Sequence, residues 1–332
     1  MLFRQLGSTG LAVSAISFGA GPVSGLLTST TAVETERGVI ARAIELGINW
    51  FDTAATYGHG RSEANLGTVL AELRPDPPVH VATKVRVSLT TETDLRPLVI
   101  ASVKESLERL KTGRITLLQI HNSITHHRHD QPTSITPEDV LGPKGLLAGM
   151  EEVRAAGWVD HFGLTGIGNA EALTTVMQSG HFSTIQAPVH LLNLSALRTI
   201  PGIETDQNYG GFLQTANQLG MGIFAIRVFA AGALLGNKPS EHTLQTPFFP
   251  VALYHQDQSH AEQLAKQLGS MTALREMALR FVLSKRPITS AIIGFGAVAH
   301  VDEAVRIAEL PRLAQQEVDE LERRSQEISL LT

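Results

Sequence analysis

Residues 33–53, VETERGVIARAIELGINWFDT, decide the fold of this chain. A helical pattern of apolar residues runs up to Gly47, a residue type that commonly follows the last turn of a helix. The apolar run INWF comes next and is typical of a buried strand, and Asp52 ends it. The stretch therefore predicts one helix followed by one strand, with a carboxylate at the end of the strand.

The same step from helix to strand repeats along the chain. Further helices are expected near 62–73, 94–111, 145–156, 169–179, 208–219, 260–285 and 300–309. Strands are expected at 14–19, 48–53, 79–85, 115–121, 159–165, 184–188, 222–226 and 289–295. Such alternation predicts parallel strands, and eight of them favour an α/β fold with a closed (β/α)8 barrel, one domain over residues 1–332. An open doubly wound sheet has the same alternation and is the alternative.

Four segments lie outside this repeat. Two short β-type runs flank residues 7–10 and predict an N-terminal hairpin, and residues 313–324 predict an added, charged C-terminal helix. The stretches 122–143 and 227–259 are expected to be long loops after strands, on the face where a barrel carries its active site.

Composition limits the classes of function. Of the 332 residues 43% are hydrophobic and 5% aromatic, which suits an aliphatic barrel interior. The formal charge of -5 and the scattered basic residues argue against nucleic acid and anionic membranes as partners. Cysteine is absent, and neither a secretory signal nor an apolar run of membrane-spanning length occurs. We expect a soluble, cytoplasmic protein with small-molecule partners; the pattern does not indicate an oligomeric state.

Four polar residues follow or end successive apolar runs: Asp52, Tyr57, Lys84 and His121. A parallel barrel would gather them at one mouth. Lys84 lies in the buried pattern VHVATKV, where an ammonium needs a carboxylate, and Asp52 on the adjacent strand is the nearest candidate. The ammonium would lower the pKa of Tyr57 from about 10 and make it a general acid, while His121 would donate a hydrogen bond to a carbonyl oxygen. Taken singly, Asp52 could equally cap a turn and His121 could be structural.

Several segments carry a family resemblance over nearly the whole chain. They are LGSTGLAVSAISFG, GINWFDTAATYGHGRSE, VATK, SLERL with ITLLQIH, and GLTGIGN, in this order. Together they resemble the aldo-keto reductase superfamily, and most of all its branch with aldose and galactose dehydrogenases. The resemblance implies that Tyr57 is the proton donor, that Asp52 and Lys84 tune it, and that His121 orients the substrate. It also implies a nicotinamide cofactor, no metal, and an aldehyde, ketone or aldose as substrate.

Cofactor contacts are expected mainly on the later strands. The pattern G-x-G-x-x-A at 294–299 lies too near the C-terminus for a Rossmann unit, but after the eighth strand the backbone at Gly294 and Gly296 can receive phosphate. By resemblance, Gln186 with Thr165 and Asn169 would contact the nicotinamide amide.

This chain departs from the family at three cofactor positions. Val189 and His190 stand where a tyrosine usually stacks on the nicotinamide. Gly296 and Ala304 stand near the family's 2′-phosphate-binding and adenine-binding residues, which makes NAD more plausible than usual. Arg227 or His300 could compensate, so NADP stays open.

The sequence also leaves an alternative function open. The departure at Val189 also fits a nicotinamide-binding regulatory or partner subunit with little turnover.

Adjacent histidines at 126, 127 and 129 suggest a metal site, but neighbours in one polar loop cannot easily converge on one ion, and we expect them to belong to a lid. Glu63 is expected to cap or salt-link the helix that begins near Ser62.

Overall fold

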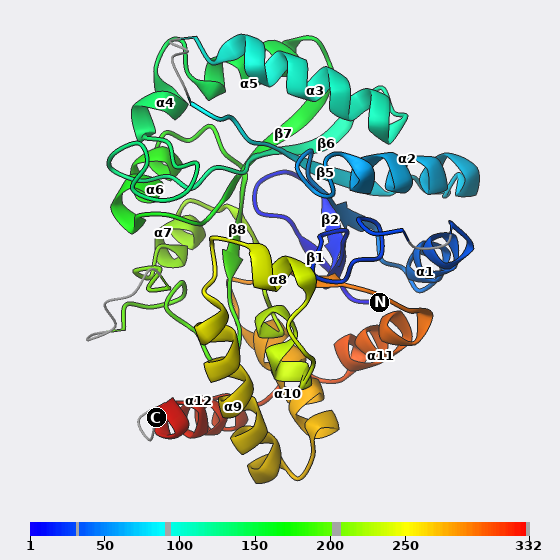
Figure 1. The fold of residues 1–332 in the computed structure, drawn as a ribbon, viewed down its shortest axis with the longest axis vertical. Helices are drawn as coiled ribbons and strands as arrows, with labels where there is room; N and C mark the ends of the chain where they lie inside the picture. Colours follow the sequence, from blue (N-terminus) through cyan, green and yellow to red (C-terminus); the bar gives the residue numbers. More distant parts are fainter. Residues whose placement is uncertain (31–32, 90–93, 201–206, 330–332) are drawn as a thin grey trace.

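The computed structural model describes residues 1–30, 33–89, 94–200 and 207–329, and in them eight parallel strands close into a barrel (Figure 1). The strands pair in chain order, and β10 pairs with β3 to close the ring. The closed ring confirms the (β/α)8 barrel and rules out the open sheet. The barrel strands are β3 (Ile16–Gly19), β4 (Trp50–Asp52), β5 (His80–Val85), β6 (Ile115–Ile120), β7 (Val159–Thr165), β8 (Thr184–Pro188), β9 (Gly222–Ile226) and β10 (Ser290–Gly294).

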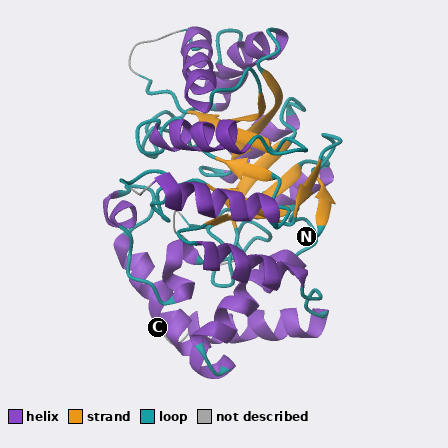
Figure 2. Cartoon of the chain, turned by 90° about the vertical axis from the view of Figure 1, so that its right-hand side faces the viewer, coloured by secondary structure: helices purple, strands orange, loops and turns teal. Residues whose placement is uncertain are grey.

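Helices surround the barrel, so that the strands lie inside the molecule (Figure 2). The added C-terminal helix is present and packs beside α9. The helices are α1 (Val33–Glu45), α2 (Arg61–Leu73), α3 (Arg96–Leu110), α4 (Pro137–Leu141), α5 (Leu146–Ala155), α6 (Ala170–Gln178), α7 (Leu213–Gln218), the 3-10 helix η1 (Ala230–Leu235), α8 (Glu241–Gln245), α9 (Val251–Leu268), α10 (Met271–Ser284), α11 (Val298–Glu309) and α12 (Gln315–Ser329).

The barrel interior has an apolar layer below a polar one. Alternate residues of a strand face the same side, so the residue two positions beyond an inward-facing residue also faces inward. The apolar layer contains Trp50, Ala82, Leu117 and Phe224, which form one buried cluster. Two positions further along their strands stand Asp52, Lys84 and Gln119, and all three are buried. The strand period thus places the polar layer at the carboxyl ends of the strands, which form the mouth of the barrel.

The N-terminal hairpin closes the opposite end. Strands β1 (Phe3–Gln5) and β2 (Ala12–Ser14) pair antiparallel, as the sequence predicts. Leu6 and Val13 belong to the buried cluster of the apolar layer. Gly7 has a φ of 50°, and a Cβ at this position would lie 2.3 Å from the backbone nitrogen of Gly222. Only glycine allows this approach, which seats the hairpin against the start of β9.

The two expected long loops and one expected helix differ from the structure. The stretch 227–259 is largely helical, because it contains η1, α8 and the start of α9, and the stretch 122–143 contains α4. The helical region expected at 260–285 begins earlier, at Val251, and consists of two helices. Gly269 ends α9 with a φ of 94°, and the side chain of Ser270 caps α10 by accepting a hydrogen bond from the Ala273 amide.

Candidate active site

The Lys84 ammonium is the centre of the polar layer. It is 1% exposed, and it donates hydrogen bonds to Asp52 Oδ1 at 2.5 Å, to the Thr53 carbonyl at 2.8 Å and to Tyr57 Oη at 3.5 Å. These three acceptors match the three N–H groups of an ammonium. Burial opposes the charge, but Asp52 and Tyr57 outweigh it and raise the pKa of Lys84 above its ordinary value. The amine is therefore a fixed cation beside the Tyr57 phenol.

Tyr57 and His121 lie next to each other at the mouth. Their rings meet edge to face, with centroids 5.5 Å apart. His121 Nδ1 is 3.3 Å from Thr56 Oγ1, which leaves Nε2 as the ring nitrogen available to a substrate. Burial, and then the charges of Arg86 and Lys84, hold the pKa of His121 well below its usual range. The imidazole is neutral at physiological pH, so it can donate one hydrogen bond without competing as a proton source. The structure therefore brings Asp52, Lys84, Tyr57 and His121 together.

Two glutamines complete the surroundings of Asp52. Gln119 Nε2 donates to Asp52 Oδ2 at 3.1 Å, and Gln186 Nε2 donates to the same oxygen. Both carboxylate oxygens are therefore occupied, as a buried carboxylate requires. Sequence analysis did not identify Gln119. Its inward position in ITLLQI, two residues before His121, was the available signal.

Glu63 lies behind the site and links three elements. Its buried carboxylate accepts hydrogen bonds from Thr83 Oγ1 of β5 at 2.5 Å and from Arg109 Nε of α3 at 2.7 Å. The expected salt link is confirmed, and it fixes α2 and α3 against the strand that carries Lys84.

The residues expected to contact the nicotinamide lie at the ends of β7 and β8. Thr165 pairs with Gln186 across the two strands, and its Oγ1 is buried without a hydrogen-bond partner among the described residues. Asn169 caps α6, because its Oδ1 accepts from the amides of Glu171 and Ala172. The amide of Gln186 is directed to Asp52 instead of outward. Of these three, Thr165 offers the unused polar atom that fits a ligand.

The residues expected to contact the cofactor phosphates follow β10. Gly294 and Gly296 are exposed, and the amide of Gly296 lies 3.4 Å from His300 Nδ1. Helix α11 begins directly afterwards with neither a side-chain cap nor an acidic residue in its first turn. An uncapped helix N-terminus preceded by exposed glycines fits a phosphate group.

Arg227 follows β9 and lies among polar groups from other elements. Its guanidinium carbon is 3.3 Å from the centroid of the Phe249 ring. Burial lowers the pKa of Arg227, and the nearby charge of Asp257 only partly offsets this. Burial raises the pKa of Asp257 to about 7, and burial and Arg227 lower that of His190 to about 3. His190 Nδ1 is buried without a partner among the described residues, and Val189 beside it is fully buried.

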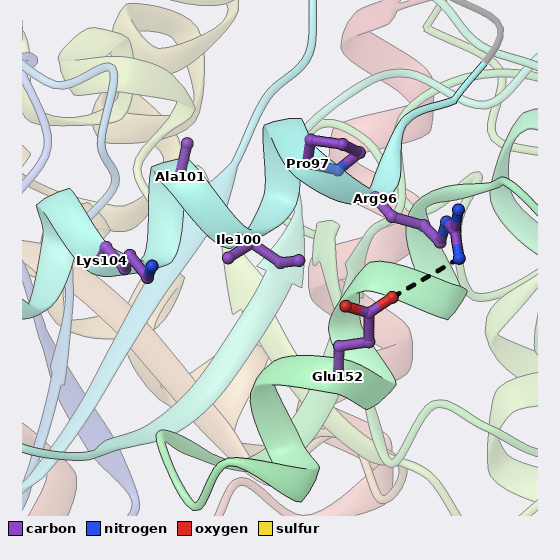
Figure 3. Close-up of a pocket in the computed structure, with 6 residues that line it drawn as sticks. All are labelled: Arg96, Pro97, Ile100, Ala101, Lys104 and Glu152. Atoms are coloured by element: carbon purple, nitrogen blue, oxygen red, sulfur yellow. Dashed lines mark ion pairs between the residues drawn. The ribbon is translucent and has the colours of Figure 1, made fainter.

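A shallow hollow on the outer wall lies away from this mouth. It is lined by residues of α3 and by Glu152 of α5, and an Arg96–Glu152 ion pair of 3.7 Å crosses it (Figure 3). Its charged groups are Arg96, Lys104 and Glu152, and none of them belongs to the polar layer of the barrel. In the described ranges, no set of three or more His, Asp or Glu residues is arranged to hold a metal ion, and no helix has the length and apolarity to cross a membrane.

Comparisons with known proteins show what this chain is similar to in sequence and fold. The model of the aldo/keto reductase family matches residues 15–325. An L-galactose dehydrogenase of Arabidopsis thaliana is 27% identical over 96% of this chain and 92% of that protein. A probable voltage-gated potassium channel subunit beta from the same plant is 23% identical over 97% of this chain and 96% of that protein. The structure of an aldo-keto reductase from Bacillus halodurans in its holo form superposes with a TM-score of 0.71 at 20% identity, covering 99% of this chain and 96% of that one.

Proposed function

We propose that this chain, which belongs to the aldo/keto reductase family, acts as one barrel domain that moves hydride between a nicotinamide cofactor, NAD or NADP, and a carbonyl or alcohol carbon. The observation that supports this most is the contact of the buried Lys84 ammonium with both Asp52 and Tyr57. A fixed cation beside a phenol stabilises the phenolate that proton donation leaves behind. The arrangement suits an acid that gives up and regains a proton in each turnover.

Tyr57, His121 and Lys84 would each have a separate role in the reaction. The bound nicotinamide supplies the hydride in reduction and accepts it in oxidation. In reduction, the hydride would form a C–H bond at the carbonyl carbon as the C=O π bond opens onto the oxygen. That oxygen would take the proton of Tyr57, so the Tyr57 O–H bond breaks as the alcohol O–H bond forms. His121 Nε2 orients the carbonyl oxygen, and Lys84 stabilises the phenolate until solvent returns the proton. Oxidation follows the same path backward.

We assign the cofactor to the side of the mouth formed by the ends of β7 to β10. Thr165 Oγ1, which has no hydrogen-bond partner among the described residues, would hold the nicotinamide end. The exposed glycines before the uncapped α11 and the Arg227 guanidinium would hold the phosphate end. We propose a carbonyl compound or an aldose as substrate, on the strength of the sequence motifs and the similarity to an L-galactose dehydrogenase.

A test follows the nicotinamide absorbance of purified protein with NADH and NADPH separately and a panel of carbonyl compounds, then with NAD and NADP and a panel of sugars. Tyr57→Phe is expected to lower kcat by about 10²- to 10⁴-fold, the usual contribution of a general acid, without weakening cofactor binding. Equal turnover by wild type and Tyr57→Phe would show that the acid is assigned wrongly.

A second candidate is a nicotinamide-binding regulatory subunit, which the similarity to a potassium channel beta subunit and the buried Val189 favour. The complete set of Asp52, Lys84, Tyr57 and His121 contacts favours catalysis over it. Tight cofactor binding, no turnover on either panel and a stable protein partner in a pull-down would reverse this preference.

A further inference from the structure

Arg86 is a charged residue at the mouth that the proposed mechanism does not use. Lys84 and Gln119 are paired in the register of β5 and β6, and the next inward-facing positions are Arg86 and His121. The Arg86 charge lowers the pKa of His121, and Tyr57 partly offsets the lowering of the pKa of Arg86 by burial, so the guanidinium lies within electrostatic range of both residues. Arg86 therefore belongs to the same layer as the groups that meet the reacting carbonyl.

The guanidinium of Arg86 is held in place but not neutralised. Its carbon lies over the Phe248 ring, 5.1 Å from the ring centroid. None of the described carboxylates forms an ion pair with it, and its Nε is buried without a hydrogen-bond partner. Lys84, by contrast, is neutralised by Asp52. The side of the mouth that holds Tyr57 and His121 thus carries a positive charge without a counter-ion among the described residues. The N–H groups of this guanidinium are not used in the described part of the chain.

These properties of Arg86 favour a carboxylate as its ligand. A guanidinium stacked on an aromatic ring loses little conformational freedom on binding and presents two parallel N–H groups, which match a carboxylate in a bidentate pair. An uncompensated, partly buried cation is also stabilised by an incoming anion. We propose that Arg86 binds a carboxylate of the substrate, so that the preferred substrates are aldehydes or aldoses that carry an acid group, such as uronates, or the corresponding alcohols.

The position of Arg86 separates this role from binding of the cofactor. Arg86 follows β5, between the strands of Tyr57 and His121, whereas Arg227 and the exposed glycines follow β9 and β10. Residues 240–250, which we name the cover segment, contact both sides. Phe248 stacks on Arg86 and Phe249 stacks on Arg227. Partial burial and then the charges of Arg227 and Arg86 lower the pKa of His242 in the same segment. Two cations thus lie under one cover, one on the substrate side and one on the cofactor side.

The test compares substrates that differ only in the acid group. The pairs are 4-carboxybenzaldehyde with 4-methylbenzaldehyde, and D-glucuronate with D-glucose. Wild type is expected to favour the carboxylate member, and Arg86→Gln to reduce the ratio of the two kcat/KM values by about 10- to 100-fold, mainly through KM. Arg86→Lys should keep part of the preference, because it retains the charge but loses the fork.

A matched control removes another stacked arginine. Arg154 lies 4.6 Å from the ring centroid of Phe162, which packs in the main core outside the apolar layer of the barrel, and Arg154→Met should leave the substrate ratio unchanged. An equal loss on both members of a pair in Arg86→Gln would overturn the proposal in favour of a general electrostatic effect. A raised KM for the cofactor with an unchanged substrate ratio would assign Arg86 to the cofactor phosphates instead.

The inference rests on the proposed oxidoreductase activity, but calorimetric titration separates the two. D-Glucuronate binding that exceeds D-glucose binding in wild type, and that disappears in Arg86→Gln, would support the carboxylate site even if no substrate were turned over. Turnover of neutral substrates without any Arg86-dependent binding of D-glucuronate would retain the oxidoreductase and reject the carboxylate site.

Discussion

The two halves of the barrel mouth are built differently. Around β4, β5 and β6, side chains from separate strands hold one another: Lys84 alone joins Asp52, Thr53 and Tyr57. Around β7 to β10, two of the expected ligand-binding residues are held locally. Asn169 bonds to the start of its own helix, and the Gly296 amide meets a residue four positions on. The proposed chemical half is thus assembled before any ligand binds, whereas the proposed cofactor half keeps its backbone donors exposed.

The variant with the largest expected effect tests whether the Lys84–Asp52 ion pair organises the half of the mouth around β4, β5 and β6. Lys84→Met leaves the Asp52 carboxylate buried without its cation, which should lower the free energy of unfolding by about 3–5 kcal/mol. The double variant Asp52→Asn with Lys84→Met should recover much of this loss, but both variants should lose about 10²-fold or more in kcat. Urea denaturation and steady-state kinetics measure the two effects. A single variant as stable as the double variant would mean that the pair does not organise this half.

The second test addresses the cofactor half through Asp257, which is 8% exposed and lies near Arg227. Its pKa is raised from 3.8 to about 7, so the folded state favours the neutral acid. This contribution to stability is complete below about pH 4 and is lost as the pH rises through 7. At about 1.4 kcal/mol per pH unit, Asp257→Asn should gain about 2–3 kcal/mol relative to wild type between pH 5 and pH 8.

Urea denaturation at the two pH values measures this gain, and Asp319→Asn on the exposed side of α12 is the control. Parallel pH profiles for wild type and Asp257→Asn would contradict the buried, neutral acid. They would also show that solvent reaches the surroundings of Arg227.

The variant with the smallest expected effect tests which part of the cofactor Arg227 binds. Arg227→Met should weaken cofactor binding about tenfold, since a charge-assisted hydrogen bond to phosphate is lost. An equal loss for NADH and NADPH would assign Arg227 to the shared pyrophosphate, and a larger loss for NADPH would assign it to the 2′-phosphate. Fluorescence titration measures both affinities, with Arg306→Met on the exposed side of α11 as control. Unchanged affinity for both would remove Arg227 from the cofactor half.

The half of the mouth around β4, β5 and β6 was also the easier half to predict from sequence. Asp52 and Lys84 interrupt apolar strand patterns, so the cost of burying them signals a partnership that the barrel then supplies. Gln119 and Arg86 give no such signal, because an uncharged amide fits a strand end and an arginine after a strand is ordinary. Their partners come from other strands or from residues 240–250, and they meet only when the barrel closes.

Prediction of the fold from sequence was limited in the same way, by contacts between distant segments. Strand positions followed from local apolar runs and are confirmed. The region after β9 was expected to be a loop because it interrupts the repeat and is rich in Ala, Gly, Pro and Gln. Helix α9 forms there because Tyr254, Ala261 and Leu264 find buried contacts that only the folded chain provides. The break between α9 and α10 was missed because Gly269 and Ser270 lie within a continuous helical pattern.

The seating of the N-terminal hairpin has a consequence for synthesis of the chain. Leu6 and Gly7 are synthesised well before Gly222, against which they pack. Until β9 emerges, the hairpin lacks the backbone against which Gly7 packs, and the barrel floor stays open. We expect nascent chains that end before residue 222 to expose this surface to chaperones and proteases, so that completion of the floor is a late event in folding.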